Sequence, residues 1–328
     1  MDEIDEILDV DLLAFEQGSA AQRRAVTDGV MASLRTGFVY TAHDLSGGLL
    51  DDAYEVLGSF FSLEPDAKMR YVDAESFGAR GYTGPLTETA AISDLPDWKE
   101  MFNWSDQPPA GHPLTTKYGR WYRPSIFPDA DIDDAGDILT EFHRRLVELQ
   151  RRFLRVIAEG IGAHETYFDR MTTYGTHLSR AIHYPPMSRA PGGGSEGHVW
   201  ADEHADINLI TALPRATDRG LQVRIDGEWT DAAPPDDHVI VNSGIMLEHV
   251  TNGLIGAGWH RVKADPDQHD SRLSVVQFCH PRPSTILTSA PPTVTHERPC
   301  RYEAVSAEDR LEEVIWEINL IPHARRID

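Results

Sequence analysis

The sequence is poor in cysteine and lacks long apolar runs. Its 328 residues include two cysteines, Cys279 and Cys300, without the C-x-x-C spacing of zinc or redox sites, which excludes a disulfide framework and indicates reduced, structural thiols. No apolar run approaches the roughly 20 residues that cross a bilayer. The acidic start, MDEIDEILDVDLL, lacks the basic flank of a secretory signal. We therefore expect a cytoplasmic protein without a membrane partner.

Basic residues are also scarce relative to acidic ones. Lysine and arginine total 30 against 53 aspartates and glutamates, which gives a formal net charge of −23. Such a surface repels phosphate backbones, so a nucleic-acid partner is not expected, and solubility explains the charge sufficiently. The length permits one large barrel domain with helical additions or two ordinary domains.

Helical patterns occupy the beginning, the middle and the end of the chain. A capping-box pattern at Ser19 starts one helix, residues 49–63 form a second, and residues 133–159 carry the apolar stripe of a long one. A serine cap at Ser306 begins a C-terminal helix. Residues 73–128 are rich in Gly, Pro, Trp and Tyr without periodicity, which indicates a loop-rich lid.

Short β-type runs separated by turn residues follow Leu178. They are residues 207–213, 221–225, 238–242 and 272–279. Closely spaced strands without intervening helices predict antiparallel sheets closed into a barrel or a double-sheet roll. We expect one domain, with a helical and lid-bearing region at 1–130, a support helix and sheet core at 131–305, and a helix and tail at 306–328.

A histidine and a carboxylate two residues apart begin a candidate metal site. On a strand, His204 and Asp206 project to the same face and can share one ion. His260 follows just beyond a glycine-rich turn. Two imidazoles and one carboxylate bind one face of an octahedral ion and leave positions open, as an oxygen-activating iron(II) centre requires.

The His-x-Asp spacing alone is weak evidence, because the chain holds fifteen histidines and a single histidine is usually structural. Rival ligands are His198, Asp202, His249 and His269. The pair Arg272 and Ser274 favours the first set, since it lies twelve residues beyond His260 with both side chains on one strand face. An arginine inside a barrel is costly unless an anion neutralises it, although a surface ion pair is the alternative explanation.

Further motifs run through most of the chain in a fixed order. They are Gly37-Phe38-Val39-Tyr40, Phe60-Phe61-Ser62-Leu63, Gly81-Tyr82, Asp97-Trp98-Lys99-Glu100, Arg180 to Pro186, Gly220-Leu221-Gln222-Val223, Asp226-Gly227-Glu228-Trp229, Asn242 to Glu248, Thr251-Asn252-Gly253, His260-Arg261-Val262 and Arg272-x-Ser274. In this order the chain resembles the iron(II) and 2-oxoglutarate dependent oxygenases of the isopenicillin N synthase type. It departs from them at Asp44, where glycine is usual, and at Ile182, where plant members carry asparagine.

The resemblance implies a mostly β fold with flanking α, in which a double-stranded β-helix (a jelly roll, cupin-like) is covered by external helices. It implies a catalytic iron(II) on His204, Asp206 and His260, and 2-oxoglutarate on Arg272, Ser274 and Tyr184, with O₂ as second co-substrate. The implied dioxygenase oxidises an unactivated C–H bond of a small molecule and forms succinate and CO₂. The retained Asp206 argues against a halogenase.

Two other activities remain open on the same ligands. One is a 2-oxoglutarate-independent iron oxidase or cyclase, because isopenicillin N synthase keeps the Arg-x-Ser pair without using that co-substrate. The other is a zinc hydrolase with a metal-bound water, which needs no arginine anchor. A non-catalytic binding module is expected to lack one of the five key residues, and none is missing.

The substrate is the least determined feature. Candidate contacts are Arg80, Tyr82, Phe102 and Trp104, although solvation of the arginine and core packing of the aromatic residues explain them equally well. His323 and Arg325 could close over the mouth, or belong to a tail. We expect an amino acid, peptide or other natural-product intermediate, in specialised metabolism or antibiotic biosynthesis.

Overall fold

The computed structural model describes residues 6–76, 78–88, 96–194, 199–264 and 268–317. His198, His323 and Arg325, named above as candidates, lie outside these residues. Within the described ranges, none of the helices is both long and apolar enough to cross a membrane.

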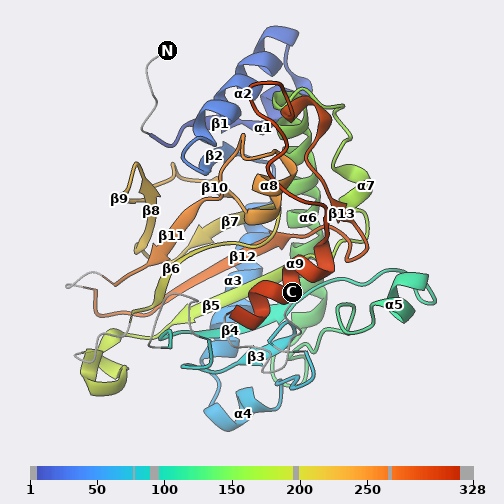
Figure 1. The fold of residues 1–328 in the computed structure, drawn as a ribbon. Helices are drawn as coiled ribbons and strands as arrows, with labels where there is room; N and C mark the ends of the chain where they lie inside the picture. The colour runs from blue at the N-terminus through green and yellow to red at the C-terminus, as the bar shows by residue number, and fades with distance from the viewer. Residues whose placement is uncertain (1–5, 77, 89–95, 195–198, 265–267, 318–328) are drawn as a thin grey trace.

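Two sheets form the centre of the molecule (Figure 1). The large sheet has the order β1 (Asp9–Asp11), β2 (Phe38–Ala42), β10 (His238–Ser243), β7 (Ile210–Ala216), β12 (Arg272–Cys279), β5 (Leu178–Tyr184), β4 (Glu100–Trp104) and β3 (Gly81–Thr83). The small sheet has the order β6 (Ala201–Ala205), β11 (Trp259–Val262), β8 (Leu221–Ile225) and β9 (Glu228–Asp231). All neighbouring strands in both sheets pair antiparallel except β1 and β2, as the closely spaced β-type runs predicted.

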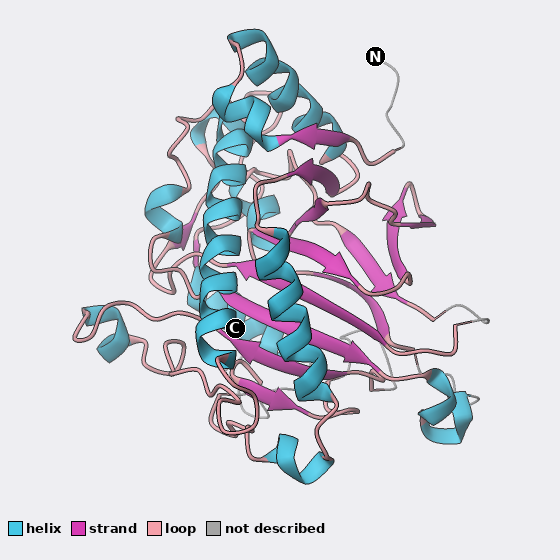
Figure 2. Ribbon diagram, turned by 180° about the vertical axis from the view of Figure 1, so that it is seen from behind, coloured by secondary structure: helices cyan, strands magenta, loops and turns pink. Residues whose placement is uncertain are grey.

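Helices cover the outside of the large sheet. The long α6 (Ala135–Gly160) lies along its back, with α3 (Gly47–Phe61) beside it (Figure 2). Most of the predicted stripe of α6, including Leu139, Phe142 and Leu146, is buried because it packs against the sheet and α3, and Ile138 at its beginning is partly buried. The other helices are α1 (Leu12–Gln17), α2 (Ala20–Ser33), α4 (Pro65–Met69), α5 (Pro113–Lys117), α7 (Asp169–Thr172), α8 (Ile245–Val250) and α9 (Ala307–Glu317), and a small ribbon pairs β13 (Ile286–Leu287) with β14 (Val305–Ser306).

The glycine- and proline-rich segment 73–128 is not irregular throughout. It supplies β3 and β4, which extend the large sheet beyond β5. Every residue of β4 is buried, because α3 and α6 cover one face and the small sheet lies over the other. A strand buried on both faces shows no alternation of apolar and polar residues, which explains why the sequence did not predict it. A lid role for the rest of the segment stays a prediction.

Alternation along the strands divides the side chains between two environments. On β4, Phe102 and Trp104 belong to the apolar cluster formed with α3 and α6. Met101 belongs instead to a cluster that contains residues of both sheets, including Tyr184 of β5 and Val262 of β11. We call the space between the sheets the barrel interior, and the candidate site lies there.

Candidate active site

Three potential metal ligands meet at one end of the small sheet. His204 of β6 and His260 of β11 are directly opposite each other in the antiparallel register, with ring centroids 4.4 Å apart. Asp206 follows the end of β6. One ligand atom from each residue lies within 4.8 Å of the other two, and no other such group occurs among the described residues. The arrangement fits one metal ion on two imidazoles and a carboxylate.

Backbone carbonyls fix the orientation of both imidazole rings. The Nδ1 atom of His204 lies 2.8 Å from the carbonyl oxygen of Asp202, and that of His260 lies 3.1 Å from the carbonyl oxygen of Gly258. Because a carbonyl oxygen can only accept, each Nδ1 carries the hydrogen. Each Nε2 is therefore left with a lone pair for a metal, which is the usual arrangement of histidine ligands.

The carboxylate of Asp206 is held in the same way. Its Oδ2 atom accepts hydrogen bonds from the hydroxyl of Thr211 and, at 2.8 Å, from the amide of Asn242. Burial alone would raise the pKa of Asp206, but the two imidazoles and these hydrogen bonds outweigh it and lower the pKa. Burial, followed by repulsion from His260, lowers the pKa of His204 to about 4. At neutral pH both groups are in the form that binds a cation.

A close contact between two glycines shapes the support of His260. A Cβ atom on Gly258 would come within 2.7 Å of the carbonyl oxygen of Gly37 and 2.9 Å of the Phe38 ring. Only glycine fits there without displacing its neighbours. The contact lets the Gly258 carbonyl face the imidazole, while the Phe38 ring packs edge-on to it, 6.0 Å between centroids.

A buried arginine lies on β12 in the large sheet. Arg272 is 1% exposed and donates hydrogen bonds to the hydroxyl of Ser274, at 2.9 Å, and to the carbonyl oxygen of Asp218, at 3.1 Å. Its guanidinium carbon lies 5.1 Å from the ring centroid of Tyr184, its cross-strand partner. No carboxylate of the described residues lies within ion-pair distance. A buried cation without a counter-ion is suited to receive an anionic ligand.

Ile182, the departure from the plant motif, lies directly opposite Ser274 on the neighbouring strand. It packs in the barrel interior with Tyr184 and Met101. The surface beside the arginine is therefore apolar at the position where plant members carry an amide.

Four residues suggested for substrate contact lie elsewhere. Arg80 is 4% exposed rather than solvated, and its guanidinium donates to the carbonyl oxygens of Trp121 and Arg123 at 3.0 Å. Tyr82, Phe102 and Trp104 pack in the cluster on the helix side of the large sheet. The structure does not bring these four side chains to the candidate metal centre, because they occupy the opposite face of their strands or a separate loop.

The rival ligands also separate from the centre. His249 is buried on α8 and stacks on Tyr302, with 5.0 Å between ring centroids, while His269 is exposed. Asp202 points its backbone carbonyl, rather than a carboxylate ligand, at His204. None of them belongs to the described metal-binding group.

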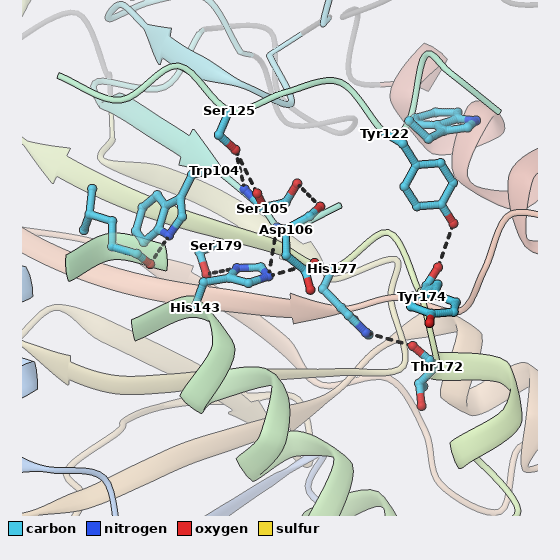
Figure 3. A network of polar contacts seen from close by, with 12 residues as sticks. Trp104, Ser105, Asp106, Tyr122, Ser125, His143, Thr172, Tyr174, His177 and Ser179 are labelled. Carbon is cyan, nitrogen blue, oxygen red and sulfur yellow. Dashed lines mark hydrogen bonds and ion pairs between the residues drawn. The ribbon is translucent and has the colours of Figure 1, made fainter. Parts of the chain in front are cut away.

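Another polar network joins α6 to the large sheet away from this centre. Figure 3 shows His143 of α6 between the hydroxyl of Ser179, at 2.8 Å, and the carboxylate of Asp106, at 3.3 Å. His177 lies close by, and its Nε2 atom is 3.0 Å from the carbonyl oxygen of Thr172. Burial lowers the pKa of His177 to about 4, so the ring is neutral at pH 7. The network ties the support helix to the strands.

A cluster of four largely buried charged side chains and one amide beside the metal ligands was not predicted from the sequence. It consists of Glu88, Asp97, Lys99, Asn103 and Arg180. Asp97, Lys99 and Arg180 occur in the motifs quoted above, which was the available signal. Glu88 and Asn103 lie outside any motif and meet the others only through folding.

Two family models match the chain. Residues 7–130 match the N-terminal domain described for the non-haem dioxygenase in morphine synthesis, and residues 175–281 match the 2OG-Fe(II) oxygenase superfamily. Among curated proteins, the chain is 26% identical to the 2-oxoglutarate-dependent dioxygenase citB of Monascus ruber, over 75% of this chain and 76% of that protein. It is 27% identical to DOWNY MILDEW RESISTANCE 6 of Arabidopsis thaliana, over 80% and 71% of the two chains.

Solved structures agree with these matches. A full-length protein of Neurospora crassa, solved in complex with alpha-KG, superposes with a TM-score of 0.82 at 25% identity, covering 96% of this chain and 99% of that one. A protein of Caulobacter crescentus assigned to the 2OG-Fe(II) oxygenase family gives a TM-score of 0.82 at 28% identity, with 95% and 99% covered. The predicted jelly-roll core with flanking helices is confirmed. The chain therefore belongs to the isopenicillin N synthase-like branch of the 2OG-Fe(II) oxygenase superfamily, and it is a 2-oxoglutarate- and iron(II)-dependent dioxygenase.

Proposed function

We propose that this dioxygenase hydroxylates, or otherwise oxidises, an unactivated C–H bond of a small molecule and forms succinate and CO₂. In this proposal His204, Asp206 and His260 hold iron(II), and the far carboxylate of 2-oxoglutarate binds Arg272, Ser274 and Tyr184. Iron, when bound, supplies the activation of O₂.

The unneutralised charge of Arg272 is the observation that carries the proposal. A guanidinium presents a planar fork that matches a carboxylate with two parallel hydrogen bonds, and such charge-assisted bonds are strong where water is excluded. The Ser274 hydroxyl lies 2.9 Å from the fork and adds a donor to the same anion. Ile182 and Phe38 belong to the apolar cluster of the barrel interior, which limits the access of water there.

The protein residues position the reaction through fixed hydrogen bonds. The carbonyl oxygens of Asp202 and Gly258 keep the Nε2 atoms of both imidazoles directed at one point. Asn242 and Thr211 hold one oxygen of Asp206 and leave the other available. Three fixed ligands leave room on the metal for co-substrate and O₂.

The biological setting is a finer part of the proposal. We propose a natural-product intermediate as substrate, such as an amino acid or peptide derivative, in specialised metabolism or antibiotic biosynthesis. Support comes from the azadirone synthase LFS of Melia azedarach, to which the chain is 27% identical over 83% of this chain. A cytoplasmic location stays a prediction from the sequence.

Two alternatives make different demands on the chain. A zinc hydrolase uses no anionic co-substrate, so nothing would neutralise the buried charge of Arg272, and the family assignment also disfavours it. A 2-oxoglutarate-independent oxidase uses the same ligands and would consume O₂ without forming succinate.

Succinate formation separates these activities. The protein is loaded with iron(II) without oxygen, mixed with 2-oxoglutarate, and exposed to air. Wild type is expected to form succinate and CO₂, and His204→Ala is expected to form neither. Zinc-dependent hydrolysis, or O₂ uptake with no succinate, would overturn the proposal.

A further inference from the structure

Two acidic and two basic side chains form a buried cluster beside the metal ligands. The Nζ atom of Lys99 lies 2.8 Å from a carboxylate oxygen of Asp97 and 3.2 Å from Oε2 of Glu88. The guanidinium of Arg180 donates from Nε to Oδ1 of Asn103 at 2.8 Å, and its Nη1 lies 3.5 Å from Oε1 of Glu88. The two positive charges balance the two negative ones.

The cluster is attached to the strand that carries His204. Oδ1 of Asp97 accepts a hydrogen bond from the backbone N–H of Asp202, at 3.2 Å. The backbone carbonyl of Asp202 in turn orients the imidazole of His204. Asn103 and Arg180 are cross-strand partners, and Arg180 is two residues from Ile182, so it faces the barrel interior. The cluster therefore borders the place where a substrate must lie to be oxidised.

Two polar atoms of the cluster have no hydrogen-bond partner. They are Oε1 of Glu88 and Nδ2 of Asn103, from side chains that are 6% and 0% exposed, and neither finds a partner among the described residues. The contact between Oε1 and the arginine, at 3.5 Å, does not satisfy hydrogen-bond geometry. An unpartnered buried polar atom is unfavourable, so two of them around one guanidinium indicate groups left for a ligand.

Their chemistry specifies what the ligand must offer. Burial would raise the pKa of Glu88, but Arg180 and Lys99 outweigh it and lower the pKa, so the carboxylate is ionised and can only accept. The Nδ2 atom of Asn103 can only donate. The ligand must therefore offer a donor to Glu88 and an acceptor to Asn103, and because both side chains contact the one guanidinium of Arg180, a compact group that carries donor and acceptor side by side fits them. The balanced charge of the cluster favours a ligand without net charge.

We propose that Glu88 and Asn103 bind a neutral substrate through a cyclic amide or imide, an inference that rests on the proposed function. Oε1 of Glu88 accepts from the N–H, and Nδ2 of Asn103 donates to the adjacent carbonyl, while Arg180 positions both side chains. An open-chain secondary amide is trans, which puts its N–H and C=O on opposite edges, whereas a ring forces them onto one edge.

Matched probes test the class. Glutarimide, uracil and 2-piperidone carry the N–H, and N-methylglutarimide, 1,3-dimethyluracil and N-methyl-2-piperidone lack it. Binding is measured by anaerobic calorimetry on the full chain loaded with iron(II) and 2-oxoglutarate. At least one N–H probe is expected to bind about 10-fold or more tightly than its methylated partner, because methylation leaves Glu88 unpartnered. Binding by none of the probes, or equal binding within each pair, overturns the inference.

Variants test which side chains distinguish an N–H probe from its methylated partner. Glu88→Gln replaces the ionised acceptor of the N–H with a weaker neutral one, so it is expected to lower the ratio within a pair. Asn103→Asp keeps the contact to Arg180 but removes the donor to the carbonyl that both members of a pair carry, so it is expected to weaken the binding of both members. Glu100→Gln is the matched control, because Glu100 belongs to a buried ion pair with Lys68 on the helix side of the same strand. The ratio in Glu100→Gln is expected to equal that of wild type. Loss of discrimination in the control alone contradicts the assignment.

The same titrations distinguish the two proposals. Binding of 2-oxoglutarate is recorded before any probe is added. If 2-oxoglutarate does not bind to wild type, the proposed function fails. If it binds and every N–H probe behaves like its methylated partner, only the assignment of Glu88 and Asn103 fails.

Discussion

Replacing Arg272 with methionine removes a buried charge while keeping most of the side-chain volume. Without ligand, the variant no longer buries a cation that lacks a counter-ion among the described residues, but it leaves the Asp218 carbonyl and the Ser274 hydroxyl without their donor. These effects oppose each other, so the free energy of unfolding is expected to change by less than about 2 kcal/mol.

In the presence of 2-oxoglutarate, the replacement of Arg272 has a large effect on the free energy of unfolding. At a concentration 100 times its Kd, 2-oxoglutarate raises the wild-type free energy of unfolding by about 2.7 kcal/mol. Loss of the charge-assisted bonds from Arg272 costs about 3 kcal/mol, which raises the Kd about 100-fold. At that ligand concentration the variant then gains only about 0.4 kcal/mol.

Denaturant unfolding of the anaerobic iron-loaded protein, with and without 2-oxoglutarate, measures both quantities. Arg80→Met is the matched control, since Arg80 is also buried and also donates to backbone carbonyls, those of Trp121 and Arg123. The control is expected to lose about 1–3 kcal/mol of stability and to keep the full ligand gain. A wild-type ligand gain in Arg272→Met would refute the placement of the co-substrate.

Three further outcomes follow from the packing. In a metal titration, Gly258→Ala is expected to weaken iron(II) binding about 10- to 100-fold, because the added Cβ displaces the carbonyl that orients His260. Gly256→Ala is the control, and it is expected to bind iron(II) like wild type because the space around its Cβ is open. The pKa of His177 is about 4 in the folded protein and near 6.5 in the unfolded protein, so the unfolded state binds a proton first as the pH falls. The free energy of unfolding is therefore expected to fall by about 3 kcal/mol between pH 6.5 and pH 4 on account of this residue. In His177→Asn the free energy of unfolding, measured across this range, is expected to depend less on pH. Phe102→Ala is expected to cost about 3–5 kcal/mol of stability and to leave the Kd of 2-oxoglutarate unchanged, and a changed Kd would contradict the placement of this ring on the helix side.

The three candidate metal ligands could be predicted from the sequence, because a spacing of two residues on a strand places side chains on the same face. His204 and Asp206 are two residues apart at the end of one strand, and the neighbouring strand brings His260 directly opposite. The clustering of these side chains agrees with the prediction, and their role as iron ligands stays a proposal. The long helix α6 could also be predicted, because its apolar residues recur at helical spacing along the one face that is buried.

The proposed substrate contacts could not be predicted, for two physical reasons. β4 is buried on both faces, so its sequence does not reveal that Phe102 and Trp104 face the helices while Asn103 faces the barrel interior. Glu88 meets Arg180 only through tertiary folding, across 92 positions of sequence. Single-sequence patterns report periodicity within an element, and they carry no record of contacts between distant loops and strands.

Buried arginines show the same limit. The sequence does not distinguish Arg80, whose guanidinium is satisfied by carbonyls of a distant loop, from Arg272, whose charge has no counter-ion among the described residues. The distinction depends on which backbone groups surround each side chain after folding. This difference supports the proposed ligand role of Arg272 and a structural role for Arg80.

A crystal structure of the chain grown without oxygen in the presence of iron(II) and 2-oxoglutarate tests the central claim most directly. We expect one iron bound by Nε2 of His204, Nε2 of His260 and a carboxylate oxygen of Asp206, and 2-oxoglutarate with its far carboxylate on Arg272. An iron on other residues, or a co-substrate whose far carboxylate is directed away from Arg272, would contradict it.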